Sequence, residues 1–243
     1  MKQTISTIDR FRKDPVGFVR RAFYKLFVGS FVYRKGGGYD AHRYWTDRFQ
    51  KYGSDLRGAG DEGLSEGENR GMYERAGQTF LEVCRRESVD FPRVRVLEIG
   101  CGTGFYTGIL RAQGVRSYTA VDITDALFDR HREDFPGYTF IRQDVTDSQL
   151  DGDFDLICMI DVIQHIVGDE RFRGAMENVK RCLKPGGLFL LTPIHGDSGK
   201  KMFYFHTRTL AEIAAHFPDY RFSDPVPFRS TALVAIRKPG LAQ

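Results

Sequence analysis

Three glycines at alternate positions, directly after an apolar segment, are the residues most indicative of chemistry. Gly100, Gly102 and Gly104 lie in the string VLEIGCGTGF, residues 96–105. Glycine has no Cβ and permits a sharp turn, so a ligand can approach the main chain closely where the strand ends. The pattern therefore predicts a loop between a buried strand and a helix that cradles a cofactor.

The register of these glycines argues against two common phosphate-binding loops. A dinucleotide-binding GxGxxG loop requires glycine where Phe105 follows Gly102, or where Thr107 follows Gly104. A GxxxxGK[ST] loop requires a lysine, and none follows Gly104 or Gly108. A nicotinamide dinucleotide or a nucleoside triphosphate is therefore disfavoured as the ligand.

Further landmarks follow in order along the chain. Asp122 ends the second predicted strand, 18 residues after Gly104, and its carboxylate can accept hydrogen bonds from two vicinal hydroxyls. The strings QDV (143–145), FDLICMIDVIQHI (154–166) and LKPGGLF (183–189) accompany the later strands. Each string alone is weakly specific, but together, in this order and at this spacing, they are strongly indicative.

Together these strings resemble the class I, Rossmann-like methyltransferases that depend on S-adenosyl-L-methionine (SAM). The likeness is good over residues 73–194 and looser in the C-terminal strands. It implies methyltransferase activity of class EC 2.1.1.-, SAM as cofactor and S-adenosyl-L-homocysteine (SAH) as product. No metal is expected, because no second carboxylate clusters with Asp161 in the sequence. The SAM-binding residues that the resemblance implies are Glu98, Gly100, Cys101, Gly102, Gly104, Asp122, Ile123, Gln143, Asp144, Val145 and Ile160.

Methyl transfer from a sulfonium is an in-line displacement, so alignment dominates and a base is needed only if the acceptor loses a proton. The candidate bases are His165, after the fourth predicted strand, and His195, after the fifth. Either could instead orient its loop; many relatives have Glu before the first histidine, where this chain has Gln164. The candidates for contact with the acceptor are Tyr39, Tyr44, Trp45, Tyr204 and His206. The N-terminal aromatic residues could equally form a small core.

Short apolar segments alternate with amphipathic ones from residue 93 onward, which predicts an α/β fold. The expected architecture is a doubly wound, mostly parallel, seven-stranded sheet with helices on both faces and an N-terminal helical extension. Strands are predicted at 94–99, 118–121, 139–142, 156–160, 188–192, 220–222 and 231–236. Helices are predicted at 72–86, 105–113, 125–134, 170–183 and 209–216.

Composition divides the chain into three parts. These are a basic amphipathic N-terminal arm (1–38), a helical and loop cap region (39–92) and the SAM-binding domain (93–243). Within the cap, the Gly/Asp/Glu-rich stretch 53–71 predicts a long loop or lid.

The composition is that of a folded protein, with 41% hydrophobic and 28% charged residues among 243. Four cysteines lie too far apart for a zinc site, which favours a reducing compartment. The sequence contains no run of 18 apolar residues, and MKQTISTIDRFRK does not resemble a secretory signal. A cytoplasmic location is therefore predicted, with membrane association left open.

The N-terminal arm carries most of the charge asymmetry. Residues 1–35 contain nine Lys/Arg and two Asp, a net charge of +7, whereas the rest of the chain has −3. Apolar residues recur at helical spacing between Pro15 and Tyr33, interleaved with basic ones. The arm could cover the protein with its apolar face, lie on an anionic membrane through residues 10–35, or bind RNA.

The predicted function is methyl transfer to a hydroxyl or amine of a small or lipid-linked metabolite, with sugar and glycan hydroxyls favoured. The alternatives are an RNA or protein methyltransferase and a SAM-binding protein without catalysis. Nucleic acid is disfavoured, because IDVI (160–163) stands where base-methylating enzymes carry an Asn-Pro-Pro-Tyr type of motif.

Overall fold

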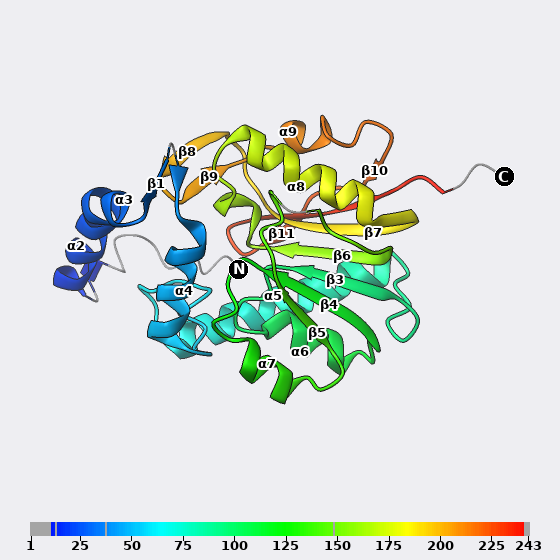
Figure 1. Cartoon of the computed structure of the whole chain (residues 1–243), viewed down its shortest axis with the longest axis horizontal. Coiled ribbons are helices and arrows are strands. Elements are labelled where there is room, and N and C mark those ends of the chain that lie inside the picture. The colour runs from blue at the N-terminus through cyan, green and yellow to red at the C-terminus, as the bar shows by residue number, and fades with distance from the viewer. Residues whose placement is uncertain (1–10, 13, 37, 148, 241–243) are drawn as a thin grey trace.

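The computed structural model describes residues 11–12, 14–36, 38–147 and 149–240. A twisted sheet of eight strands forms the centre, with seven strands in the order β10-β12-β7-β6-β3-β4-β5 and β11 paired with β12 (Figure 1). Strands β3 to β7 are parallel, β12 pairs antiparallel with β7, and β10 and β11 each pair antiparallel with β12. The predicted α/β fold is thus confirmed, with β11 as an additional short strand. The strands of this sheet are β3 (Arg95–Ile99), β4 (Ser117–Asp122), β5 (Thr139–Arg142), β6 (Phe154–Ile160), β7 (Leu183–Ile194), β10 (Arg221–Phe222), β11 (Val226–Phe228) and β12 (Thr231–Arg237).

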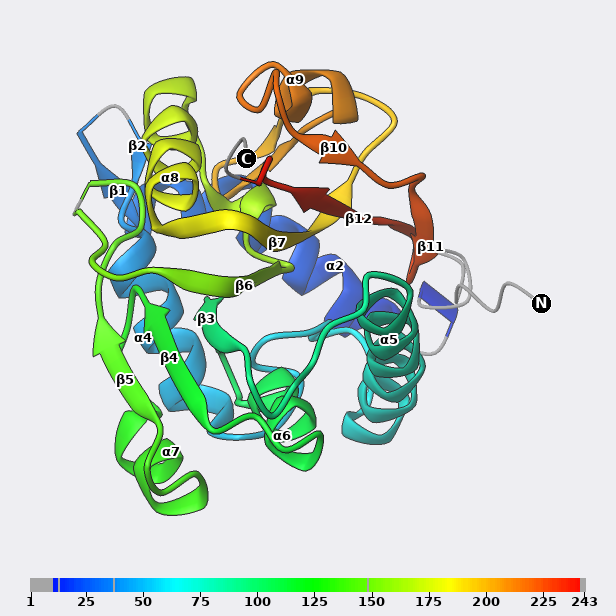
Figure 2. The same cartoon turned by 90° about the vertical axis from the view of Figure 1, so that its right-hand side faces the viewer.

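Helices cover both faces of the sheet (Figure 2). They are α5 (Glu66–Arg86), α6 (Phe105–Ala112) and α7 (Phe128–Asp134) on one face, and α8 (Asp169–Cys182) and α9 (Leu210–Ala214) on the other. Alternate residues of β6 enter opposite cores: Leu156 and Cys158 pack on the first face, Ile157 and Met159 on the second. This continuous apolar segment is typical of a parallel strand buried on both sides.

The order of the strands places the site. From β3 the chain proceeds to β4 and β5 on one side, then returns to β6 and β7 on the other. Ligands of such sheets bind at this switch point, outside the carboxyl ends of the strands. The loops after β3, β4, β5, β6 and β7 all end there.

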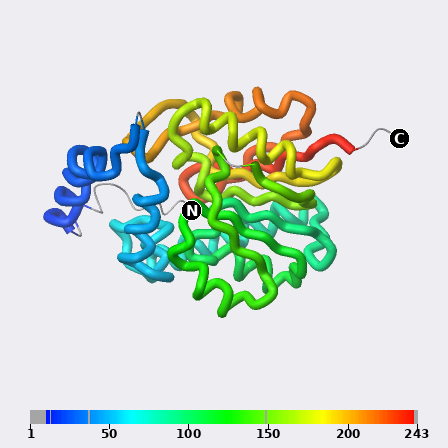
Figure 3. The backbone as a smooth tube through the Cα atoms, in the orientation of Figure 1, coloured from blue at the N-terminus to red at the C-terminus, as the bar shows by residue number. Residues whose placement is uncertain are grey.

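The N-terminal part of the chain forms a helical arm and a cap at one end of the molecule, far from the C-terminal end of the described chain (Figure 3). Its elements are α2 (Pro15–Phe23), the π-helical turn η1 (Tyr24–Val28), α3 (Gly29–Val32), the hairpin β1 (Arg34–Lys35) and β2 (Gly38–Tyr39), and α4 (Ala41–Tyr52). Asp14 caps α2 and Asp40 caps α4 through backbone amides of the first turn. Arg10, which the membrane hypothesis included, lies outside the described residues.

The loop predicted over residues 53–71 ends earlier than expected, at Ser65. Helix α5 begins at Glu66, because Ser65 and Glu68 form a reciprocal capping box. The remaining loop is held by Arg48, whose guanidinium donates to the carbonyls of Arg57 (3.0 Å) and Gly60 (2.7 Å). A buried arginine thus fixes this segment against α4.

Residues 184–187 separate the predicted helix 170–183 from the predicted strand 188–192. In the structure they form an irregular stretch inside β7. The register to β6 skips from Leu183 to Leu188, and Gly186 has a positive φ of 74°. A second hairpin follows β7, formed by β8 (Gly199–Met202) and β9 (Phe205–Thr207). It lies beside the N-terminal arm (Figure 1).

Candidate active site

The loop after β3 folds as the glycine spacing predicted. Gly100, Gly102 and Gly104 all have positive φ values, of 78°, 50° and 80°. At Gly100 a Cβ atom would lie 2.3 Å from a methyl carbon of Val162, so a side chain does not fit there. The Gly102 amide donates to the Asp122 carboxylate at the end of β4 (3.0 Å).

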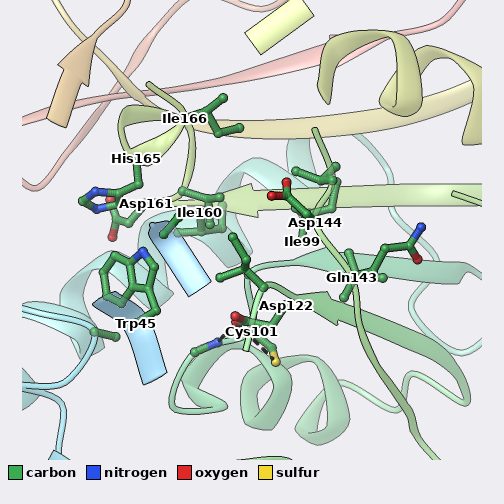
Figure 4. Close-up of a pocket in the computed structure, with 18 of the residues that line it drawn as sticks. Trp45, Ile99, Cys101, Asp122, Gln143, Asp144, Ile160, Asp161, His165 and Ile166 are labelled. Atoms are coloured by element: carbon green, nitrogen blue, oxygen red, sulfur yellow. Dashed lines mark hydrogen bonds between the residues drawn. The ribbon is translucent and has the colours of Figure 1, made fainter. Parts of the chain in front are cut away.

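A cavity of about 120 Å³ lies over this loop (Figure 4). Its wall includes nine of the eleven residues implied as SAM-binding. They are Gly100, Cys101, Gly102, Asp122, Ile123, Gln143, Asp144, Val145 and Ile160. The ends of four strands thus contribute to one cavity.

Asp122 is 8% exposed and lies at the floor of this cavity. Burial raises its pKa to about 6, although hydrogen bonds from the amides of Gly102 and Thr124 lower it. The Gly102 amide and the Cys101 thiol (4.0 Å) donate to one oxygen and the Thr124 amide donates to the other, and a carboxylate has about four acceptor sites. Capacity remains for a hydroxyl donor.

Glu98 and Gly104 do not line the cavity. The Glu98 side chain is buried and accepts hydrogen bonds from the hydroxyls of Thr107 (3.0 Å) and Tyr118. Burial raises its pKa to about 7. Glu98 therefore braces the loop and α6 from behind, and Gly104 lies against His131.

Asp144 lines the cavity, but both carboxylate oxygens already have partners. One oxygen accepts from the Thr146 amide (2.9 Å) and hydroxyl, and the other from Arg171 (2.6 Å). Burial opposes ionisation of Asp144, yet these partners outweigh it and lower its pKa. The side chain thus fixes the turn after β5.

A larger cavity, of about 680 Å³, adjoins the first. This volume falls within the range of roughly 300–1,000 Å³ common for ligand sites. Four residues line both cavities, which therefore meet at Trp45, Ala59, Asp161 and His165. Figure 4 shows Trp45, Asp161 and His165 grouped on one side of the first cavity.

His165 lies at this junction, in the 3₁₀ turn η2 (Ile163–His165). Its Nδ1 lies 3.0 Å from the carbonyl of Tyr204, so Nδ1 carries the proton. The Gln164 amide nitrogen donates to the Asp161 carbonyl (2.9 Å) and faces His165 Nε2 at 3.1 Å. Burial lowers the pKa of His165 to about 4. His165 is therefore neutral at pH 7, and its lone pair is occupied by Gln164.

His195 follows β7 and lines only the second cavity. Its Nε2 is buried and has no hydrogen-bond partner among the described residues. Burial lowers the pKa of His195, and the nearby Asp197 carboxylate opposes this effect. Unlike Nε2 of His165, this nitrogen has no partner among the described residues.

The aromatic candidates share one cluster above the junction. Tyr44 and Tyr204 stack at 5.0 Å between ring centroids, and the Tyr39 hydroxyl donates to the His165 carbonyl (2.8 Å). Trp45 meets His165 edge to face at 4.9 Å. Tyr39 faces the first cavity, Tyr44 and Tyr204 face the second, and Trp45 faces both. His206 lies in β9 and lines neither cavity.

Sequence reasoning missed a buried ion pair at the junction. Asp161, at the end of β6, pairs with Arg229 in the turn between β11 and β12. Both residues have left-handed backbones, with φ values of 58° and 54°. The Arg229 guanidinium also lies 3.9 Å over the Tyr73 ring. No local signal identifies this pair, since its members are 68 residues apart.

Comparison with known proteins fits this geometry. Residues 97–191 match the sequence model of a family described as a methyltransferase domain. A probable phthiotriol/phenolphthiotriol dimycocerosates methyltransferase of Mycobacterium ulcerans is 37% identical over 109 residues, 43% of this chain and 41% of that protein. A hybrid PKS-NRPS synthetase of Fusarium is 30% identical over 137 residues, 51% of this chain and 3% of that protein. The chain thus spans well under half the length of either relative.

Solved structures share the fold at low sequence identity. A DhpI complex with SAM has a TM-score of 0.62 at 20% identity, covering 85% of this chain and all of that one. The magnesium protoporphyrin IX methyltransferase of Synechocystis, with SAM bound, has a TM-score of 0.61 at 17% identity, covering 84% and 100%.

Residues 97–191 therefore match a methyltransferase domain, and the strand order and the glycine loop give this domain the class I, Rossmann-like fold of SAM-dependent methyltransferases. SAM is its cofactor, and it supplies an electrophilic methyl group when bound. The cavity fits this cofactor, because its floor offers a buried carboxylate and a loop in which Gly100, Gly102 and Gly104 carry no Cβ atom. Among the described residues, no cluster of three or more His, Cys, Asp or Glu side chains could hold a metal ion.

Proposed function

We propose that the enzyme methylates a hydroxyl of a small or lipid-linked metabolite, with sugar or glycan hydroxyls as candidates. The observation that carries this proposal is the junction of the two cavities at Asp161 and His165. Cofactor in the first cavity and acceptor in the second would meet there, which is the alignment that in-line transfer requires.

His195 is the better candidate for the base. A hydroxyl loses its proton as its oxygen gains the methyl group, and the CH₃–S bond breaks with its electron pair retained by sulfur. His195 lines the acceptor cavity and has a buried ring nitrogen without a partner among the described residues, whereas the lone pair of His165 faces Gln164. His165 then acts mainly as a wall between the cavities, held by Trp45 and Tyr204.

The acceptor class is supported by the size and lining of the second cavity. Charged side chains line it beside aromatic ones, among them Arg48, Glu62 and Tyr204. Such a wall suits a polar head group better than a hydrocarbon chain. The proposal includes lipid-linked acceptors because the Mycobacterium relative is named as a methyltransferase of phthiotriol and phenolphthiotriol dimycocerosates.

The test is transfer from methyl-labelled SAM into cell extract, with the products separated into organic, small aqueous and macromolecular fractions. Label in either of the first two fractions is expected, and label confined to RNA or protein would overturn the proposal. His195→Asn should lower the transfer rate about a hundredfold. SAM affinity should stay unchanged, because His195 does not line the first cavity.

The matched control is His165→Asn, which removes the other histidine. Its imidazole contributes no free lone pair, so the variant should lose less than about tenfold in transfer rate if His195 is the base. A larger loss in His165→Asn than in His195→Asn would reverse the assignment of the base. It would leave the methyltransferase class intact.

A further inference from the structure

The N-terminal arm presents its apolar side chains outward. Among the described residues, ten large hydrophobic side chains are exposed, and only Ile141 and Met202 lie outside the arm. The exposed side chains of the arm are Phe11, Val16, Val19, Phe23, Tyr24, Leu26, Phe27 and Phe31. Exposure reaches 65% at Phe27 and 80% at Phe31. Apolar exposure of this kind marks an interaction surface.

The side of the arm that faces the body of the protein carries charged residues and a glycine. Lys25 lies 3.7 Å from Glu62, and Arg21 pairs with Asp14 at 2.9 Å. At Gly29 a Cβ atom would lie 2.8 Å from the Phe203 ring, so helix and body touch closely. This arrangement contradicts the interpretation of the arm as a cover that buries its apolar face, because that face points away from the protein.

The charge of the arm indicates what lies on this face. Arg12, Arg20 and Arg34 are exposed and form no ion pair with a described residue. Asp14 is the only acidic residue from position 11 to 36. A helical segment with exposed aromatic and aliphatic residues flanked by unpaired arginines is complementary to an anionic lipid surface. No helix among the described residues has the length and apolar character to cross a bilayer.

We propose that the arm docks the enzyme on anionic lipid. The helical segment Pro15–Val32 lies in the interface, with Phe23, Leu26, Phe27 and Phe31 inserted and the arginines at the head groups. The other side of this segment contributes Lys25 to the wall of the second cavity. A helix is about 10 Å across, so docking brings the acceptor cavity within about one helix diameter of the bilayer.

A consequence for the substrate follows and rests on the proposed function. An acceptor anchored in the bilayer by its hydrocarbon chain would reach the cavity with its polar head group only. The wall beside Lys25 fits this requirement, since Arg48, Glu62 and Glu68 also line the cavity. The inferred acceptor class is therefore an amphiphile with a hydroxyl in its head group.

The docking test is co-sedimentation of the full chain with vesicles of phosphatidylcholine alone or mixed with phosphatidylglycerol, without SAM or acceptor. Binding to the anionic vesicles is expected, and it should weaken with added salt. The double variant Phe23→Gln/Phe27→Gln should lower binding about tenfold or more, because it removes inserted aromatic side chains. Arg20→Gln/Arg34→Gln should lower binding and its salt dependence.

The control is Ile141→Gln/Met202→Gln, which removes the exposed hydrophobic side chains outside the arm and should leave vesicle binding unchanged. SAM affinity reports folding in every variant. Equal loss in control and arm variants would overturn the proposal. So would RNA binding that depends on the arginines but not on the phenylalanines, or a dimer abolished by Phe23→Gln/Phe27→Gln without vesicle binding.

Failure of the docking inference is separable from failure of the proposed function. Vesicle binding is measured without methyl transfer, so its absence removes the arm hypothesis only. Transfer of label to a lipid head group in detergent, combined with absent vesicle binding, would keep the function and overturn docking. Vesicle binding without label in any organic or small aqueous product would keep docking and overturn the proposed function.

Discussion

The two cavities are built in different ways. The first centres on the glycine loop and the ends of four neighbouring strands, β3 to β6, and aromatic side chains of α4, α5 and α6 complete its wall. The second draws on α4, the loop before α5, the segments after β6 and β7, and the turn before β12. Its lining includes long charged side chains, among them Lys25, Arg48 and Arg229. The strand-end part of the first cavity is therefore specified by short sequence motifs, whereas the acceptor cavity depends on tertiary packing of distant segments.

This difference has a physical cause. A glycine loop owes its shape to the freedom of its own backbone, so local sequence specifies it. The Asp161–Arg229 pair forms only after β6 and the β11–β12 hairpin are in place. Left-handed non-glycine residues cost roughly 1–3 kcal/mol each and persist only where the surroundings enforce them. Changes in the two regions should therefore have different effects on folding and binding.

The largest expected effect comes from breaking the Asp161–Arg229 pair. Asp161→Asn leaves the Arg229 charge without its partner, at a cost of about 3 kcal/mol in unfolding free energy. This is the low end for a buried pair, because the side chains are 21% and 13% exposed. Denaturant unfolding measures the change.

The double variant Asp161→Asn/Arg229→Gly separates stability from function. It removes both charges and places residues that tolerate a left-handed backbone at both positions. The unfolding free energy of this double variant should return to within about 1 kcal/mol of the wild-type value. Its rate of methyl transfer should be below that of the wild type, because the junction has lost its carboxylate. Restored transfer would show that the pair has only a structural role.

Gly100→Ala tests the local character of the first cavity. A Cβ would meet Val162 at 2.3 Å, so the loop must move, and SAM affinity should fall about a hundredfold. Gly137→Ala is the matched control, because Gly137 also has a positive φ, of 89°, but no neighbouring atom within 4 Å of the added Cβ. Calorimetric titration with SAM gives both values. Equal losses of SAM affinity in the two variants would show that backbone strain, and not the clash with Val162, causes the effect.

The sequence predicted the cofactor half far better than the rest. Periodicity identified the seven main strands, and the glycine register and Asp122 identified the first cavity. Glu98 does not line the first cavity, because strand residues alternate between faces and its side chain points to Tyr118 behind the loop. The start of α5 was readable, since Ser65 and Glu68 are a capping box in the sequence.

The acceptor half was less predictable, because its key contacts are long-range. No pattern brings Arg229 to Asp161, and none places His195 against Phe205 of the β8–β9 hairpin, where the ring centroids lie 5.8 Å apart. Periodicity did predict the amphipathic arm. It could not predict that the apolar face is turned outward, which is determined by the contacts of Lys25 and Gly29 with the body.

The smallest expected effect is a dependence of SAM affinity on pH. Burial raises the pKa of Asp122 to about 6, so the carboxylate becomes protonated as the pH falls through this value. A protonated group accepts ribose hydroxyls less well, and SAM affinity should therefore drop about tenfold between pH 8 and pH 5. Asp122→Asn should bind SAM weakly at both pH values.

The control is Glu98→Gln, which removes the other buried carboxylate, whose pKa burial raises to about 7. Since Glu98 lies behind the cavity, this variant should keep the wild-type pH dependence of SAM binding. If SAM affinity of Glu98→Gln did not change with pH, the titrating group would be Glu98 and not Asp122. Cofactor binding would then depend on tertiary packing behind the loop, as the acceptor cavity does.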